Sequence, residues 1–167
     1  MLAKKEESGE TFLSRFVYPL IGLIAIVAFF SGLLGRNGLN FELALKDCIR
    51  VSVSAFGGFH LAAYCLNEFW SGIFKREKDL VLCQKFVGYS ASLMLVIYMM
   101  LILIPEFFFL GIFVLYTFYI VWEGAVPYMH VEENDRLKFV GIATSLIILM
   151  PIIIDKALSL FIIGLRN

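Results

Sequence analysis

The chain has 167 residues, of which 60% are hydrophobic and 17% are charged, whereas a soluble domain carries about 45–50% and about 25%. This composition excludes a water-soluble enzyme, and its 16% of aromatic residues excludes a disordered chain. The 14 basic residues balance the 14 acidic ones, so no basic surface indicates nucleic-acid binding. Roughly 100 apolar residues suffice for five spans of about 20 residues each, which predicts an all-α, polytopic membrane bundle of five transmembrane helices.

The first span is predicted from the uncharged run Phe16–Leu34, which is 19 residues long. Residues 1–15 are polar and mixed in charge, so we expect them to form an N-terminal tail in the cytoplasm. No small-residue cleavage site follows the run, which indicates a retained span and not a signal peptide. Small residues at helical spacing predict a smooth stripe that another helix can approach: Ala25, Ala28, Gly32 and Gly35.

The second span, Asp47–Trp70, is the most polar one because it contains Arg50, His60 and Glu68. A charge at the centre of a span costs about 2.5–3.5 kcal/mol on insertion, which nearly cancels the gain from the apolar residues. Arg50 and Glu68 lie near the ends, where long side chains can reach the interface. The helix is still too polar to face lipid on every side, and we expect it inside the bundle.

The third and fourth spans are predicted over Phe86–Ile104 and Phe107–Trp122, after a polar connector of residues 71–85. Only Pro105 and Glu106 separate these two spans, which predicts a tight antiparallel hairpin.

The last span is expected to start near Phe139, after a loop of residues 123–138, and to continue past Pro151 towards Leu165. No second domain is visible, so residues 16–165 are expected to form a single membrane domain.

An odd number of spans places the two chain ends on opposite sides of the membrane. With a cytoplasmic N-terminus, nine basic residues lie inside: Lys4, Lys5, Arg15, Lys75, Arg76, Lys78, Lys85, Arg136 and Lys138. Five lie outside or near that face: Arg36, Lys46, Arg50, Lys156 and Arg166. Because basic residues favour the cytoplasmic side, this asymmetry predicts that the N-terminus is inside.

Several charges of the spans are candidates for function, since ionisable residues within a membrane are rare and costly. The topology brings Arg50 and Asp155 to the outer side, where they can pair across two helices, and Glu106 is a rival partner. At the inner side, Glu68 and Glu123 lie level with Arg136 and Lys138. All of these charges lie near span ends, so interfacial charges or structural clamps are the favoured interpretation over a functional path.

His60 lies near the middle of the second span, where a proton relay would suit its pKa. No carboxylate lies at helical spacing from it, so a satisfied or lumen-facing histidine is favoured. His130, Glu132 and Glu133 could suggest a metal site, but a solvated loop is the better interpretation.

Motifs for enzyme activity are absent: the chain has no metalloprotease, nucleophile-elbow, dinucleotide-binding or phosphate-loop sequence. We therefore expect no catalytic residue, no cofactor and no metal. Tyr116, Tyr119 and Trp122 lie at i, i+3 and i+6 and indicate an aromatic belt at the membrane interface.

The segment 115–151 resembles the Yip family, the five-span membrane proteins that interact with Ypt and Rab GTPases. The matching features are an aromatic-rich fourth span, a glycine after it, and a short loop with a basic and apolar entry into the last span. The positions that carry this likeness are Tyr116, Tyr119, Trp122, Gly124, Pro127, Arg136 and Phe139. With only about 15 residues before its first span, the chain is similar to the short bacterial members, which implies a bacterial inner membrane and no Rab partner.

Two hypotheses for function follow. The first is a non-enzymatic membrane protein of the Yip type that binds a protein partner or lipid through its cytoplasmic loops, 71–85 and 123–138. The contact candidates on that face are Lys75, Arg76, Lys78, Arg136 and Lys138. The alternative is a small transporter or channel subunit whose path is lined by Arg50, His60, Glu68 and Asp155, and which requires a homo-oligomer because one bundle of this size is small for a pore.

Overall fold

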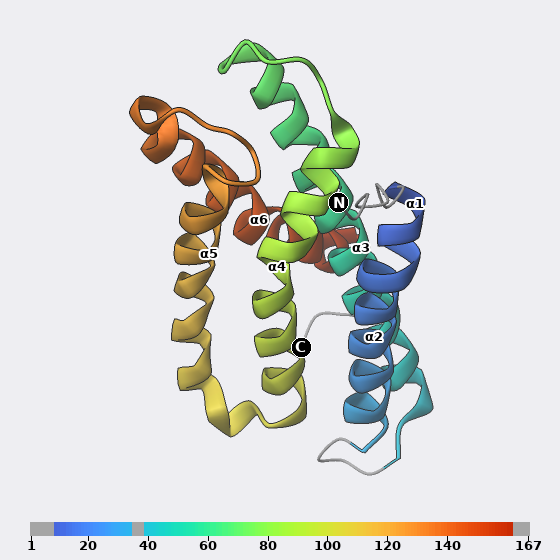
Figure 1. The fold of residues 1–167 in the computed structure, drawn as a ribbon. Coiled ribbons are helices and arrows are strands. Elements are labelled where there is room, and N and C mark those ends of the chain that lie inside the picture. Colours follow the sequence, from blue (N-terminus) through green and yellow to red (C-terminus); the bar gives the residue numbers. More distant parts are fainter. Residues whose placement is uncertain (1–8, 35–38, 162–167) are drawn as a thin grey trace, which may run out of the picture.

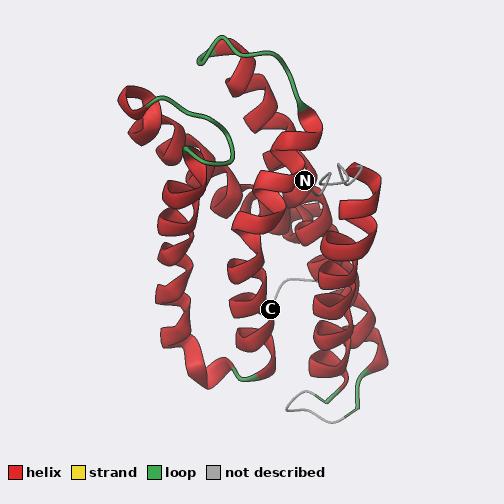
Figure 2. Cartoon of the chain, viewed as in Figure 1, coloured by secondary structure: helices red, strands yellow, loops and turns green. Residues whose placement is uncertain are grey.

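The computed structural model describes residues 9–34 and 39–161, which fold into helices joined by short loops, with no strand among them (Figure 1, Figure 2). Within these two ranges, five helical segments are long and apolar enough to cross a membrane. The protein is therefore a five-span, multi-pass helical membrane protein, as its composition predicts. Its apolar helices contact the lipid bilayer. Five residues named in the sequence analysis lie outside the described ranges. Four of them are basic residues that bear on the orientation, Lys4, Lys5, Arg36 and Arg166, and the fifth is Gly35 of the small-residue stripe.

The first span begins earlier than the sequence predicts. It consists of α1 (Gly9–Phe12), a short π-helical stretch η1 (Leu13–Val17) and α2 (Tyr18–Leu33). The expected tail of residues 1–15 is therefore helical from residue 9 onward, and its residues 1–8 lie outside the described part. The extension has a physical reason, because Phe12 is buried and its ring centroid lies 4.9 Å from that of Tyr89.

The second span, α3, runs over Phe41–Gly72 and is the interior helix that its polarity predicts. It packs against α2, α4 and α6, and 44% of its most apolar stretch is buried, the largest share of the five spans found in the described residues. Its start is fixed by Asn40, whose side-chain oxygen accepts a hydrogen bond of 3.0 Å from the backbone N–H of Leu43. Close packing on α2 confirms the small-residue stripe at Gly32, where an added Cβ would lie 2.8 Å from Cα of Ala44.

The third span, α4 (Leu80–Leu103), starts within the segment that the sequence analysis assigned to a connector. Asp79 caps it by accepting a hydrogen bond of 2.9 Å from the backbone N–H of Leu82. The expected connector of residues 71–85 was thus too long, and only residues 73–79 lie between α3 and α4.

The fourth span consists of a 3₁₀ helix, η2 (Pro105–Leu115), followed by α5 (Tyr116–Ala125). Only Ile104 separates α4 from η2, which confirms the tight hairpin. Pro105 and Glu106, expected to be the break, are instead the first residues of η2, since proline suits the first helical position. No residue of η2 is buried, so this half of the span contacts α4 but leaves most of its side chains outside the bundle.

The last span, α6 (Glu133–Phe161), passes behind α4 and contacts α3, α4 and α5 (Figure 1). The loop before it covers only residues 126–132, so the expected loop of residues 123–138 was too long. Arg136 and Lys138 consequently lie on the first turns of α6.

Gly58 and Pro151 make a close contact between α3 and α6. A Cβ added at Gly58 would lie 2.6 Å from Cγ and 2.7 Å from Cα of Pro151. Pro151 lies inside α6 and donates no backbone hydrogen bond, which membrane helices tolerate when a neighbouring helix packs at that point. A glycine at position 58 is therefore needed for the two backbones to approach.

We expect Gly58→Ala to lower the free energy of unfolding by about 1–3 kcal/mol, because the methyl group overlaps backbone atoms that cannot rotate away. The measurement is thermal unfolding of the purified protein in detergent. The matched control is Gly22→Ala in α2, where an added Cβ meets nothing within 4 Å. Equal unfolding temperatures for the two variants would contradict this account of the α3–α6 contact.

Candidate functional site

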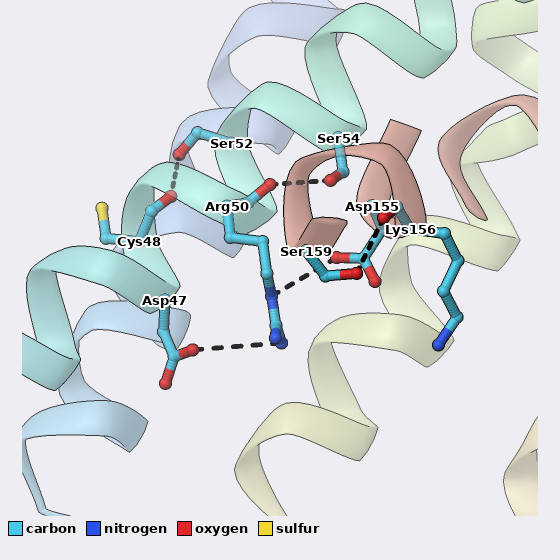
Figure 3. Close-up of polar contacts among 8 residues, drawn as sticks. All are labelled: Asp47, Cys48, Arg50, Ser52, Ser54, Asp155, Lys156 and Ser159. Carbon is cyan, nitrogen blue, oxygen red and sulfur yellow. Dashed lines mark hydrogen bonds and ion pairs between the residues drawn. The ribbon is translucent and has the colours of Figure 1, made fainter. Parts of the chain in front are cut away.

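A cluster of three charged residues joins α3 to α6 (Figure 3). Arg50 Nε lies 3.3 Å from Asp155 Oδ1, which confirms the predicted pair between the second and fifth spans. The same guanidinium reaches Asp47, with 3.9 Å between Nη2 and Oδ1. Glu106, the rival partner considered from the sequence, lies at the start of η2 in the hairpin.

The Arg50–Asp155 contact is an ion pair without an aligned hydrogen bond. Arg50 Nε and Asp155 Oδ1 are both buried atoms, and neither has a hydrogen-bond partner among the described residues. The two side chains are 30% and 27% exposed, so the pair is partly open to the surroundings of the bundle. The cluster therefore has unused capacity both to donate and to accept a hydrogen bond.

We expect Arg50→Met to lower the free energy of unfolding by about 1–3 kcal/mol, because it leaves Asp47 and Asp155 without their shared counter-charge, and Asp155→Asn to cost less, because Arg50 keeps Asp47 at 3.9 Å. The double variant Arg50→Met/Asp155→Leu should recover part of the loss from Arg50→Met, since of the two carboxylates only Asp47 then remains without Arg50. The free energies of unfolding of the wild type, the two single variants and the double variant are measured in detergent, which completes a double-mutant cycle. As a control, Glu42→Gln breaks the Glu42–Lys46 pair, in which the Glu42 side chain is 78% exposed, and should leave the free energy of unfolding nearly unchanged. If the loss in free energy of unfolding of the double variant equals the sum of the losses of the two single variants, Arg50 and Asp155 are not coupled.

His60 is surrounded by aromatic rings and not by carboxylates. Its ring centroid lies 4.5 Å from that of Phe56, 4.9 Å from Phe59 and 6.3 Å from Tyr18 on α2. Nε2 is buried and has no hydrogen-bond partner among the described residues, so of the satisfied or lumen-facing histidine that the sequence favours, the satisfied form is not found at this nitrogen.

Ion pairs also connect the segments at the opposite end of α3. Lys78 Nζ donates hydrogen bonds of 2.6 and 2.8 Å to the two carboxylate oxygens of Glu68, and this contact raises the pKa of Lys78. Arg76 Nη2 lies 3.2 Å from Glu132 Oε1, which joins the loop 73–79 to the loop 126–132. Glu123, expected level with Arg136 and Lys138, is exposed and makes no ion pair with a described residue.

Arg136 anchors the start of α6 on α5. Its Nη2 donates a hydrogen bond of 3.0 Å to the backbone oxygen of Trp122, and its guanidinium carbon lies 4.4 Å from the Trp122 ring centroid. Glu133 pairs with it at 3.1 Å, while Lys138 lies 3.7 Å from Asp135.

The other positions of the family-like segment are divided between surface and core. Tyr116 and Tyr119 are half exposed on α5, with ring centroids 5.0 Å apart, and Pro127 is exposed in the loop. Gly124 faces Phe86, since an added Cβ would lie 3.1 Å from its ring, and Phe139 is fully buried.

A hollow of about 240 Å³ lies where the two loops 73–79 and 126–132 meet. Two aromatic residues, Trp70 and Phe74, contribute to its lining, as do charged residues of both signs. Lys75 lies at its rim, is exposed and has a left-handed backbone with φ of 51°.

Sequence reasoning missed this hollow together with the Lys78–Glu68 and Arg76–Glu132 pairs, since each depends on the path of a loop. The loop group His130, Glu132 and Glu133 forms no metal site: within residues 9–34 and 39–161, no three His, Cys, Asp or Glu side chains are placed to hold a metal ion. Comparison of the chain with protein-family models, with curated proteins and with solved structures finds no match.

Proposed function

We propose that the protein is a non-enzymatic membrane protein of the Yip type that binds a protein partner through its cytoplasmic face. That face consists of the loop 73–79, the loop 126–132 and the first turns of α6. The observation that carries the proposal is the meeting of the two loops, fixed by the Arg76–Glu132 pair, around the hollow of about 240 Å³.

The charge of this face favours a protein over anionic lipid head groups. Residues 75–79 and 132–138 together carry five basic and five acidic side chains, so the face has no net charge. Lipid recognition of the polybasic kind uses clusters of about 4–8 basic residues without such compensation. In addition, Arg76, Lys78, Arg136 and Lys138 already pair with acidic residues of the same chain.

The unpaired groups of the face suit a protein contact. Lys75 and Glu77 are exposed and have no ion-pair partner among the described residues, so each can pair with a partner protein. Trp70 and Phe74 line the hollow together with Lys75, and the partly exposed Phe74 is the ring that a partner can reach, since Trp70 is buried. Aromatic residues are enriched in the anchor positions of protein interfaces.

The proposed location is the bacterial inner membrane, with the N-terminus in the cytoplasm. Support comes from the basic residues of the loop 73–79 and the start of α6, since both lie at the same end of the bundle as α1 (Figure 1). The hairpin at Ile104 and the start of α3 lie at the other end (Figure 1).

A photo-cross-linking residue at Glu77 should capture one discrete protein in native membranes, and Lys75→Glu should reduce that adduct about tenfold, because it reverses a charge in the contact. The matched control places the same residue at Leu39, which is 79% exposed at the opposite end of the bundle. Identical adducts from both positions, or an adduct unaffected by Lys75→Glu, would contradict the proposal.

The Arg50–Asp155 cluster favours a second candidate, a small oligomeric transporter or channel subunit, because its buried polar atoms are unsatisfied. Under the first proposal, the purified protein in liposomes is expected to move no ion or solute. A measured flux that Arg50→Ala and Asp155→Ala each abolish, while both variants still fold, would replace the first proposal with the second.

A further inference from the structure

A cavity of about 200 Å³ lies in the membrane-spanning part of the bundle, between α3, α4, η2 and α6. Eight of its eleven lining residues are apolar, among them Ala55 and Met94. The three polar ones are Ser54, Tyr98 and Asp155, so the cavity combines a hydrocarbon-like wall with part of the charge cluster. It is separate from the cytoplasmic face formed by the loops.

The size and opening of the cavity suit a single hydrocarbon chain. An apolar cavity of about 150 Å³ can hold one benzene molecule, so about 200 Å³ accommodates a short length of chain but not a whole phospholipid. Ile152 lines the cavity and is 49% exposed, which places a mouth on the lipid-facing surface of α6. The remainder of a long chain can therefore stay in the bilayer.

The polar wall determines the head group. Asp155 Oδ1 is a buried acceptor without a hydrogen bond, and Arg50 Nε, 3.3 Å away, is a buried donor without one (Figure 3). A hydroxyl group in the cavity can donate a hydrogen bond to the carboxylate of Asp155, which is the member of this pair that lines the cavity. Two carboxylates, Asp47 and Asp155, face the single guanidinium of Arg50, so an anionic head group would be repelled.

We infer that this cavity is a binding site for an uncharged amphiphile with one hydrocarbon chain and a hydroxyl head group. The hydrocarbon chain of the ligand lies against the apolar wall between α4 and α6, and its hydroxyl group donates a hydrogen bond to Asp155 Oδ1. The inference does not depend on the proposed function, because the site shares no residue with the cytoplasmic face.

The test uses the full-length protein in phosphatidylcholine liposomes and three photoreactive probes of equal chain length: a 1-alkanol, an alkane and a carboxylic acid. Each probe carries its photoreactive group in the chain, and mass spectrometry locates the labelled residues. The alkanol should label the cavity walls on α4 and α6 about tenfold more than the alkane, because a hydrogen bond to a charged group is strong in a low dielectric. The alkanol should also label the cavity walls more strongly than the carboxylic acid does.

Two neighbouring residues of α6 provide matched variants. Ile152→Trp fills the mouth of the cavity and should reduce alkanol labelling by about tenfold or more. Ile153→Trp is the control: Ile153 is 53% exposed and does not line the cavity, so labelling should stay unchanged. Both positions face lipid, so the larger side chains leave the fold intact, which thermal unfolding checks.

Asp155→Asn tests the head group separately. It replaces a charged acceptor by a neutral amide oxygen, so alkanol labelling should fall towards the level of the alkane while alkane labelling stays as it was. The inference is overturned if alkanol and alkane label the wild-type protein equally, if the acid labels it most strongly, or if Ile153→Trp reduces labelling as much as Ile152→Trp.

Discussion

The polarity of α3 is the constraint on which the arrangement of the other helices depends. A helix that carries Arg50, His60 and Asn67 cannot expose its whole circumference to hydrocarbon, because unpaired polar groups in a membrane cost several kcal/mol each. In the bundle, α2, α4 and α6 pack against α3 and cover part of its surface. Asp155 on α6 then supplies a counter-charge for Arg50 at the point where the two helices pack.

The cover is tight because small residues line the contacts. Because Gly32 has no side chain, the backbone of α3 packs directly against α2 at this point, and Gly58 allows the same close approach of Pro151 on α6. Without water, helices associate through close packing and polar contacts and not through the hydrophobic effect. The backbone approach at Gly58 and the ion pair at Arg50 therefore act on the same pair of helices and determine their register together.

Much of this fold is predictable from the sequence, since the bilayer imposes a length on every apolar run. Topology also brings Arg50 and Asp155 to the same side of the membrane, because consecutive spans alternate in direction, but it leaves Glu106 as a rival partner. Helix ends were less predictable, because residues beside an apolar run can extend its helix, as residues 80–85 do at the start of α4 and residues 133–138 at the start of α6. The hollow between the loops has no sequence signal, because it forms where two loops meet, and each loop contains a left-handed residue, Lys75 and His130.

The 3₁₀ form of η2 has a consequence for the thickness of membrane that the protein fits. A 3₁₀ helix rises about 2.0 Å per residue and an α-helix about 1.5 Å. The 18 residues from Phe108 to Ala125, which follow the non-helical Phe107, consequently reach about 31 Å, with eight residues in 3₁₀ form and ten in α form. As an α-helix alone they would reach about 27 Å, so the stretched backbone lets a short fourth span cross the roughly 30 Å of the hydrocarbon core.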